Sequence, residues 1–160
     1  MAAAVAGSAI ALVLPWLSQA YENEGAAGWR RDRPQAYGRL ERAAEFNPLA
    51  AQPLLVKGSI ALQKRDLLVA RDALARAEER EPKNWYIHFQ LALAEAVAGR
   101  QRSARLHIIR AAELNPRDPV VAAARRQILR GETPNPERLN SRFLVELNRR
   151  FGRNVADPTR

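Results

Sequence analysis

A repeating pattern with a period of 34 constrains this chain more than any other feature of its sequence. Proline recurs at this interval, and an alanine lies five residues before each proline, a large aliphatic residue eight before it and a second alanine twelve before it. The four registers are Pro48, Pro82 and Pro116; Ala43, Ala77 and Ala111; Leu40, Leu74 and Ile108; and Ala36, Ala70 and Ala104. A fixed period of this length is typical of repeat proteins, in which each repeat is one supersecondary unit.

The spacing inside the pattern predicts a helical hairpin. Positions twelve, eight and five before a proline are separated by four and three residues, so they share one face of an α-helix. The alanines allow a neighbouring helix to come close, and the proline ends the helix and begins a turn. A second apolar stretch precedes each such helix, at 54–63 and at 85–98, with corners at 63–66 and at Gly99. Each unit is therefore predicted to be helix–turn–helix, and the fold all-α.

The composition agrees with a helical core, and the net positive charge has more than one interpretation. The 160 residues are sufficient for one domain, aromatic residues make up 6%, and there is no cysteine to form disulfides or thiolate metal sites. The net charge is +9, and only three of the 26 basic residues are lysines. An arginine-rich bias often accompanies a GC-rich genome, although this charge also permits attraction to nucleic acid or anionic lipid.

The period, the prolines and the small residues Gly58 and Ala92 resemble the tetratricopeptide repeat (TPR) family. The resemblance implies a short right-handed solenoid with units at 17–50, 51–84 and 85–118 and a partial unit at 119–134, within a repeat domain at 22–134. The sequence departs from the family at four positions of the leading helices where tryptophan and tyrosine are usual. These positions hold Leu54, Ala61, His88 and Glu95.

Two segments follow the repeats. Residues 135–152 are predicted to form a closing helix with Leu139, Phe143 and Leu147 on one face and arginines on the other. Residues 153–160 are expected to be a disordered tail.

Residues 1–21 differ from the rest of the chain because they contain no charged side chain. Twenty helical residues span about 30 Å, the thickness of a bilayer core, so we expect a membrane-associated helix at 1–21. Ala3, Gly7 and Ala11 lie on one helix face and suit close packing against another membrane helix. A cleaved signal peptide, with Ser18–Ala20 as its cleavage region, and a buried first helix remain alternatives. The side of the membrane stays open.

The sequence contains no recognisable catalytic, metal or cofactor motif. His88 and His107 lie in different predicted helices and belong to no HExxH pattern or two-histidine, one-carboxylate set. Glu78, Glu79 and Glu81 fit a solvated charged helix face. We therefore expect neither a cofactor nor a small-molecule substrate, and no enzymatic activity.

The TPR resemblance instead implies a partner groove along the leading helices. In the register of the family, the exposed inner positions are Gln52, Leu55, Ser59, Leu62, Tyr86, Phe89 and Leu93. Such a groove suits an extended or helical segment of another protein. In the alternative interpretation, Tyr86 and Phe89 only cover the first unit or the closing helix.

Basic residues gather toward the C-terminus and offer a contact for an anionic lipid or an acidic partner. They include Arg125, Arg126, Arg130, Arg149 and Arg150. Nucleic-acid binding is a weaker interpretation because few aromatic residues are interspersed among them.

The leading hypothesis is a membrane-associated scaffold that helps to assemble a membrane or envelope complex. The stretches "LPWLS" and "NPLAAQPLLVKGSIALQKRD" are also similar to the repeat tail of bacterial O-antigen ligase or polymerase-like envelope proteins. This second resemblance implies an accessory or detached tail of such a protein.

Overall fold

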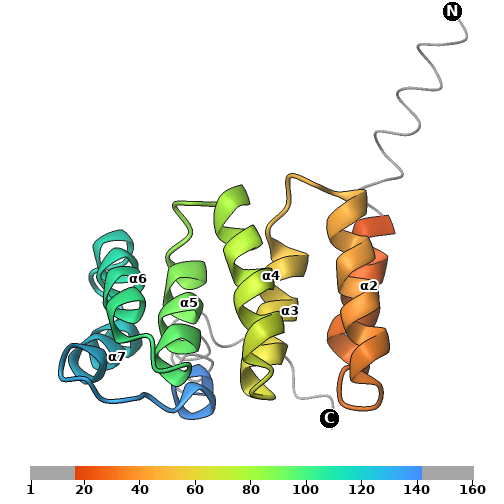
Figure 1. Cartoon of the computed structure of the whole chain (residues 1–160). Coiled ribbons are helices and arrows are strands. Elements are labelled where there is room, and N and C mark those ends of the chain that lie inside the picture. The colour runs from red at the N-terminus through yellow and green to blue at the C-terminus, as the bar shows by residue number, and fades with distance from the viewer. Residues whose placement is uncertain (1–16, 142–160) are drawn as a thin grey trace, which may run out of the picture.

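The computed structural model describes residues 17–141, and every secondary-structure element in this range is an α-helix (Figure 1). The predicted membrane-packing residues Ala3, Gly7 and Ala11 lie outside the described range, as do Arg149 and Arg150 and the predicted tail. The helices are 17–28, α2 (Arg33–Phe46), α3 (Gln52–Gln63), α4 (Leu67–Arg80), α5 (Trp85–Val97), α6 (Gln101–Leu114), α7 (Pro119–Leu129) and 136–141. The prediction of an all-α fold built from helical hairpins is confirmed.

The hairpins follow the period of the sequence. The trailing helices α2, α4 and α6 begin at Arg33, Leu67 and Gln101, one period apart, and each packs against the leading helix that precedes it. The leading helices are 17–28, α3, α5 and α7, and α4 and α6 also pack on the leading helix that follows them. Figure 1 shows the hairpins arranged side by side in one row.

The repeating proline fixes where each trailing helix stops. The last hydrogen bond of the helix runs from the residue before the proline to the repeating alanine. The N···O distances are 3.1 Å for Asn47 to Ala43, 3.0 Å for Glu81 to Ala77 and 2.9 Å for Asn115 to Ala111. The residue that donates has a ψ of 82°, 71° or 73°, because a following proline disfavours the helical conformation.

The two helices of a hairpin come close because a glycine lies where they meet. A Cβ atom placed on Gly58 would be 2.5 Å from Cγ of Leu74, and one placed on Gly25 would be 2.7 Å from Cγ of Leu40. Both leucines belong to the repeating aliphatic register and are fully buried. The leucine therefore rests on the backbone of the leading helix, and a larger residue in place of the glycine would separate the helices.

An ion-pair cluster joins the first two hairpins. Glu41 of α2 accepts hydrogen bonds of 2.6 Å from Lys57 of α3 and from Arg76 of α4. The bond from Arg76, with a further contribution from Lys57, holds the pKa of Glu41 at about 2 against the opposing effect of burial. The carboxylate therefore stays charged throughout the physiological pH range, and the three helices remain linked by it.

A second arginine satisfies backbone groups at the turn between these hairpins. One guanidinium nitrogen of Arg80 lies 3.3 Å from the carbonyl oxygens of Ala44 and Asn47 and 2.7 Å from that of Ala50. The carbonyls at the end of a helix have no partner within the helix, so this side chain from α4 stabilises the end of α2.

The beginning of the described chain packs as part of the first hairpin. The hydroxyl of Ser18 donates to the carbonyl of Ala43 at 2.8 Å, and the ring of Tyr21 stacks on Phe46 with centroids 5.5 Å apart. Residues 17–21, the last part of the predicted membrane helix, thus contact α2. Over residues 17–141, none of the helices has the length and apolarity needed to cross a bilayer.

Two glycine substitutions test the close helix contact. Gly58→Ala is expected to lower the free energy of unfolding by about 1–3 kcal/mol, because the new methyl group meets both Leu74 and the backbone carbonyl of Ala70. Gly38→Ala is the matched control, since Gly38 lies on an exposed face of α2 with no atom within 4 Å of the new methyl group. This control is expected to stabilise the protein by about 0.5–1 kcal/mol. Urea denaturation measures both values, and an unchanged Gly58→Ala variant would contradict the contact.

Candidate functional site

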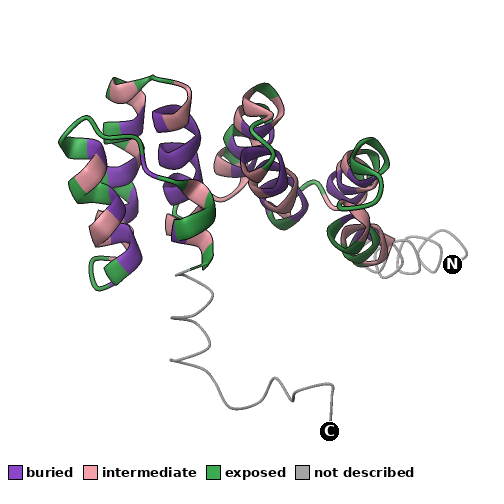
Figure 2. Ribbon diagram, turned by 90° about the horizontal axis from the view of Figure 1, so that it is seen from below, coloured by how far each residue is buried: buried purple, intermediate pink, exposed green. Residues whose placement is uncertain are grey.

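The leading helices form one face of the stack, here called the inner face, and α5 forms its centre. Every residue of α5 from Ile87 to Ala96 is buried (Figure 2). A helix on the surface of a solenoid normally keeps one polar, exposed side, whereas a helix buried all round has neighbours on every side. Helices α4 and α6 pack on α5, and α3 touches it. These neighbours leave the inner side of α5 to be covered by another part of the chain.

The helical segment 136–141, here called the closing segment, lies against α5. Leu139 of this segment is 3% exposed and belongs to the same hydrophobic core as α5. The side-chain carbonyl of Asn140 accepts a hydrogen bond of 2.9 Å from the amide of Gln90, which is fully buried in α5. The same amide also donates to the hydroxyl of Tyr86 at 2.7 Å. One apolar and one polar contact thus hold the closing segment on the inner face.

The start of the closing segment reaches the ends of several leading helices. A cavity of about 50 Å³ is lined by the C-terminal ends of α3 and α5 and by the residues that begin the segment. Its lining residues are Leu62, Gln63, Arg65, Val97, Asn135, Pro136 and Glu137. The segment therefore lies across the inner face, near the ends of α3 and α5.

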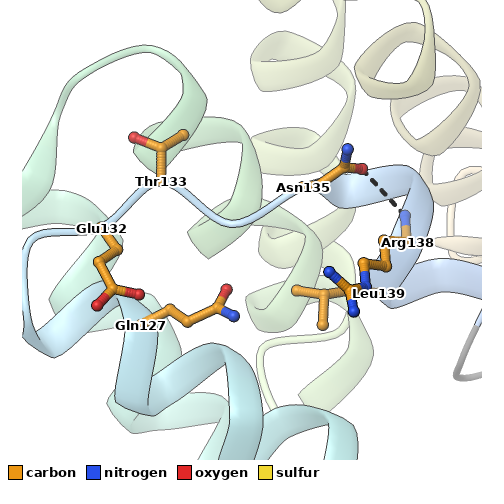
Figure 3. Close-up of a pocket in the computed structure, with 6 residues that line it drawn as sticks. All are labelled: Gln127, Glu132, Thr133, Asn135, Arg138 and Leu139. Carbon is orange, nitrogen blue, oxygen red and sulfur yellow. Dashed lines mark hydrogen bonds between the residues drawn. The ribbon is translucent and has the colours of Figure 1, made fainter.

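A larger, polar cavity of about 310 Å³ separates the closing segment from α7 (Figure 3). Its lining includes Gln127 of α7, Glu132 and Thr133 of the connecting loop, and Arg138. The side chain of Asn135 accepts a 3.0 Å hydrogen bond from the backbone of Arg138 and so caps the first turn of the segment. The closing segment is therefore a helix with a capped N-terminus, and the cavity lies between it and α7.

The predicted groove residues are only partly accessible. Four of the seven are at most 6% exposed: Leu55 at 6%, Leu62 at 1%, and Phe89 and Leu93 at 0%. The prediction that these four side chains are exposed on the inner face is therefore wrong. Gln52 is exposed, and Ser59 and Tyr86 are half-buried. The alternative interpretation, in which Tyr86 supports the closing helix, agrees with its hydrogen bond to Gln90.

The closing segment does not continue the repeat, and α7 differs from α3 and α5 at one position. The close-contact position of the leading helices holds Gly58 in α3 and Ala92 in α5, and the corresponding position of α7 holds Arg126. Arg126 is exposed, as are Arg125 and Arg130. This position of α7 is therefore not covered by a trailing helix. The closing segment instead packs on the inner face.

The structure also corrects the interpretation of the two histidines. Helix packing brings together three side chains that could bind a metal: Glu78 of α4, His88 of α5 and His107 of α6. One carboxylate oxygen and one imidazole nitrogen from each histidine all lie within 4.8 Å of one another. The prediction that the histidines belong to no two-histidine, one-carboxylate set is therefore wrong. The three residues come from three helices with no motif spacing, so only the packing of α4 on α5 and of α5 on α6 reveals them.

Comparison with solved structures identifies the fold. The TPR domain of Arabidopsis OM64 aligns with 72% of this chain and with 96% of its own length, at a TM-score of 0.65 and 16% sequence identity. The fold is that of a TPR domain. No protein-family model matches the sequence, and no curated protein matches it either. The TPR-like fold is thus supported by the three-dimensional arrangement, at a sequence identity too low to transfer a function.

Substituting Leu139 tests whether the closing segment covers the inner face. Leu139→Asp buries a charge against α5, so we expect the segment to detach and the free energy of unfolding to fall by about 2 kcal/mol. Exposure of the apolar side chains of α5 should then raise the fluorescence of the dye ANS. Arg138→Asp is the control, because Arg138 is exposed in the same helix and its change should cost no more than about 0.5 kcal/mol. Equal dye binding by the two variants would contradict this arrangement.

Proposed function

We propose that the chain is a non-enzymatic TPR-like scaffold that binds a helical segment of another protein on its inner face. The observation that carries this proposal is the closing segment itself. The inner face buries the aliphatic side chain of Leu139, which belongs to this short helix. The face also donates a hydrogen bond to the helix, from the amide of Gln90 to the side-chain carbonyl of Asn140. A surface with this complementarity is suited to a helix-in-groove mode of recognition.

One accessible part of the inner face lies beside the closing segment, on α3. Gln52 is exposed, and Val56 and Ser59 are half-buried, one helical turn apart along α3. The neighbouring side chains of Leu55 and Leu62 in the same helix are buried. A partner helix that binds here would run alongside the closing segment and extend the contacts that this segment already makes.

We further propose that the uncharged N-terminal segment associates the scaffold with a membrane through its residues before 17, since residues 17–21 pack on α2, and that the chain helps to assemble a membrane or envelope complex. The absence of charged side chains from residues 1–21 supports this proposal. Residues 17–21 of that segment belong to helix 17–28 of the first hairpin, so the binding face would be held near the bilayer. The side of the membrane on which the hairpins lie stays open.

The other hypotheses stay predictions. An accessory role beside an envelope glycan ligase or polymerase depends on the resemblance of the short stretches quoted above. A nucleic-acid-binding role depends on the net charge of +9, and its binding would weaken steeply with salt. The arginines Arg125, Arg126 and Arg130, which are exposed on and after α7, would equally serve as a contact for anionic lipid or an acidic partner.

Site-specific photo-crosslinking tests the proposed binding face. A photoreactive amino acid at Ser59 of α3 should give an adduct with one defined protein when the chain is expressed in its native cells. The same amino acid at Ser103, a half-buried serine on the trailing helix α6, is the matched control and should not give this adduct. The same adduct from both positions, or none from Ser59, would contradict binding on the inner face.

Fractionation tests the membrane proposal separately. The full chain is expected to remain in the membrane pellet after a wash with high salt, because apolar burial does not depend on ionic strength. A variant that begins at residue 17 keeps all the described hairpins and should move to the supernatant. If the full chain is recovered in the supernatant, the membrane proposal is wrong, whereas the proposed binding face is unaffected.

A further inference from the structure

A partly buried cluster of two histidines and one glutamate lies where two successive hairpins meet. Nδ1 of His88 is 3.1 Å from one carboxylate oxygen of Glu78, and Nδ1 of His107 is 3.6 Å from the same oxygen. The two imidazole rings are stacked, with centroids 5.8 Å apart. Glu78 comes from α4, His88 from α5 and His107 from α6, so the cluster joins the second hairpin to both helices of the third.

The surroundings of His88 determine which of its nitrogens carries a proton. Nε2 lies 2.9 Å from the carbonyl oxygen of Pro82. A carbonyl only accepts hydrogen bonds, so in the neutral ring Nε2 must be the protonated nitrogen. Nδ1 then carries the lone pair of the ring, and it lies 3.1 Å from the oxygen of Glu78. This nitrogen is buried and has no hydrogen-bond partner in the described part of the chain.

An unprotonated nitrogen and a carboxylate oxygen 3.1 Å apart repel each other unless a proton or another cation lies between them. A buried polar atom without a partner costs free energy, and each such atom in a folded protein needs an explanation. The second histidine offers another lone pair at the same place. The side chain of His107 is only 22% exposed, so this second imidazole is also largely shielded from water.

We propose that Glu78, His88 and His107 bind a divalent transition-metal ion, with Zn²⁺ as the expected occupant. Imidazole nitrogen and carboxylate oxygen are common zinc ligands, with bonds of about 2.0–2.2 Å that place neighbouring ligand atoms about 3.3 Å apart in a tetrahedron. The two nitrogen–oxygen separations of 3.1 Å and 3.6 Å lie on either side of this value, and all three ligand atoms lie within 4.8 Å of one another, so binding requires a small approach of the two imidazoles. Three protein ligands leave a fourth position for water.

Two further features suit this assignment. The carbonyl of Pro82 orients the ring of His88 through its other nitrogen, which is the usual second contact of a metal-binding histidine. Access from solvent is also available, because the side chains of Glu78 and His107 are 31% and 22% exposed while that of His88 is 6% exposed. An ion can therefore reach a site whose deepest ligand is already held in place.

The bound ion would strengthen the contact between hairpins. Its three ligands belong to α4, α5 and α6, which the chain otherwise joins through apolar packing and through the ion pair of Arg71 with Glu95. A ligand that binds only the folded state stabilises it in proportion to its concentration. The site would thus make the stability of the scaffold dependent on metal.

Metal titration of the full chain without a histidine tag tests this proposal. The chain has two histidines and no cysteine, so His88 and His107 are its only imidazole or thiolate ligands. We expect one Zn²⁺ per chain by calorimetry, a rise in Tm with Zn²⁺ concentration, and a visible absorption band for bound Co²⁺. His107→Ala and Glu78→Gln should each weaken binding by at least about tenfold. Glu79→Gln, a change at the neighbouring exposed residue, should bind as the wild type does.

Two results would overturn the proposal. The first is a wild-type chain that binds Zn²⁺ no more tightly than the His107→Ala variant, with both shown to be folded by circular dichroism. The second is a nitrogen chemical shift of His88 that shows a proton on Nδ1 and does not change when Zn²⁺ is added. That result would mean that a protonated His88 pairs with Glu78 and that the cluster is an ion pair.

Discussion

A leucine of each trailing helix in the first two hairpins rests directly on a glycine of the leading helix beside it. The contacts of Leu40 with Gly25 and of Leu74 with Gly58 leave no room for a Cβ atom. This close approach sets the distance between the helices of a hairpin and hence the surface that each hairpin offers to the next. The repeating proline then ends each trailing helix at the same position of the repeat, so that the next leading helix starts at a constant place in the repeat. The core that runs from α2 to α7 depends on this spacing.

The inner face shows what happens when the repeat ends. In α7 the close-contact position holds the exposed Arg126, and the segment that follows packs against α5 through Leu139 and Asn140. The helix α5 is mostly apolar, and it is buried because the chain covers its inner side. Closure protects apolar surface that a solenoid of this size would otherwise expose to water. It also leaves part of α3 accessible, at Gln52, Val56 and Ser59.

Most of the fold could be predicted from the sequence because the repeat is a local pattern. The alanines, the aliphatic residue and the proline lie within one helix and its turn, so their spacing alone predicts where each trailing helix ends. The closing segment could not be placed in this way. Its position depends on Gln90, which is far along the chain from its partner Asn140, although the apolar position Leu139 indicated a helix that packs on the repeats. The Glu78 cluster escaped prediction for the same reason, since helix packing brings its members together.

The closure of the stack is tested most directly by a distance between the closing segment and the inner face. The chain contains no cysteine, so cysteines introduced at Gln63 of α3 and at Glu137 of the closing segment are the only thiols that a spin label can modify. These two residues line the same cavity. Double electron–electron resonance should then give a single narrow distribution at the short limit of the method. A broad or long distribution would show that the closing segment lies elsewhere, and it would contradict the closure of the inner face by this segment.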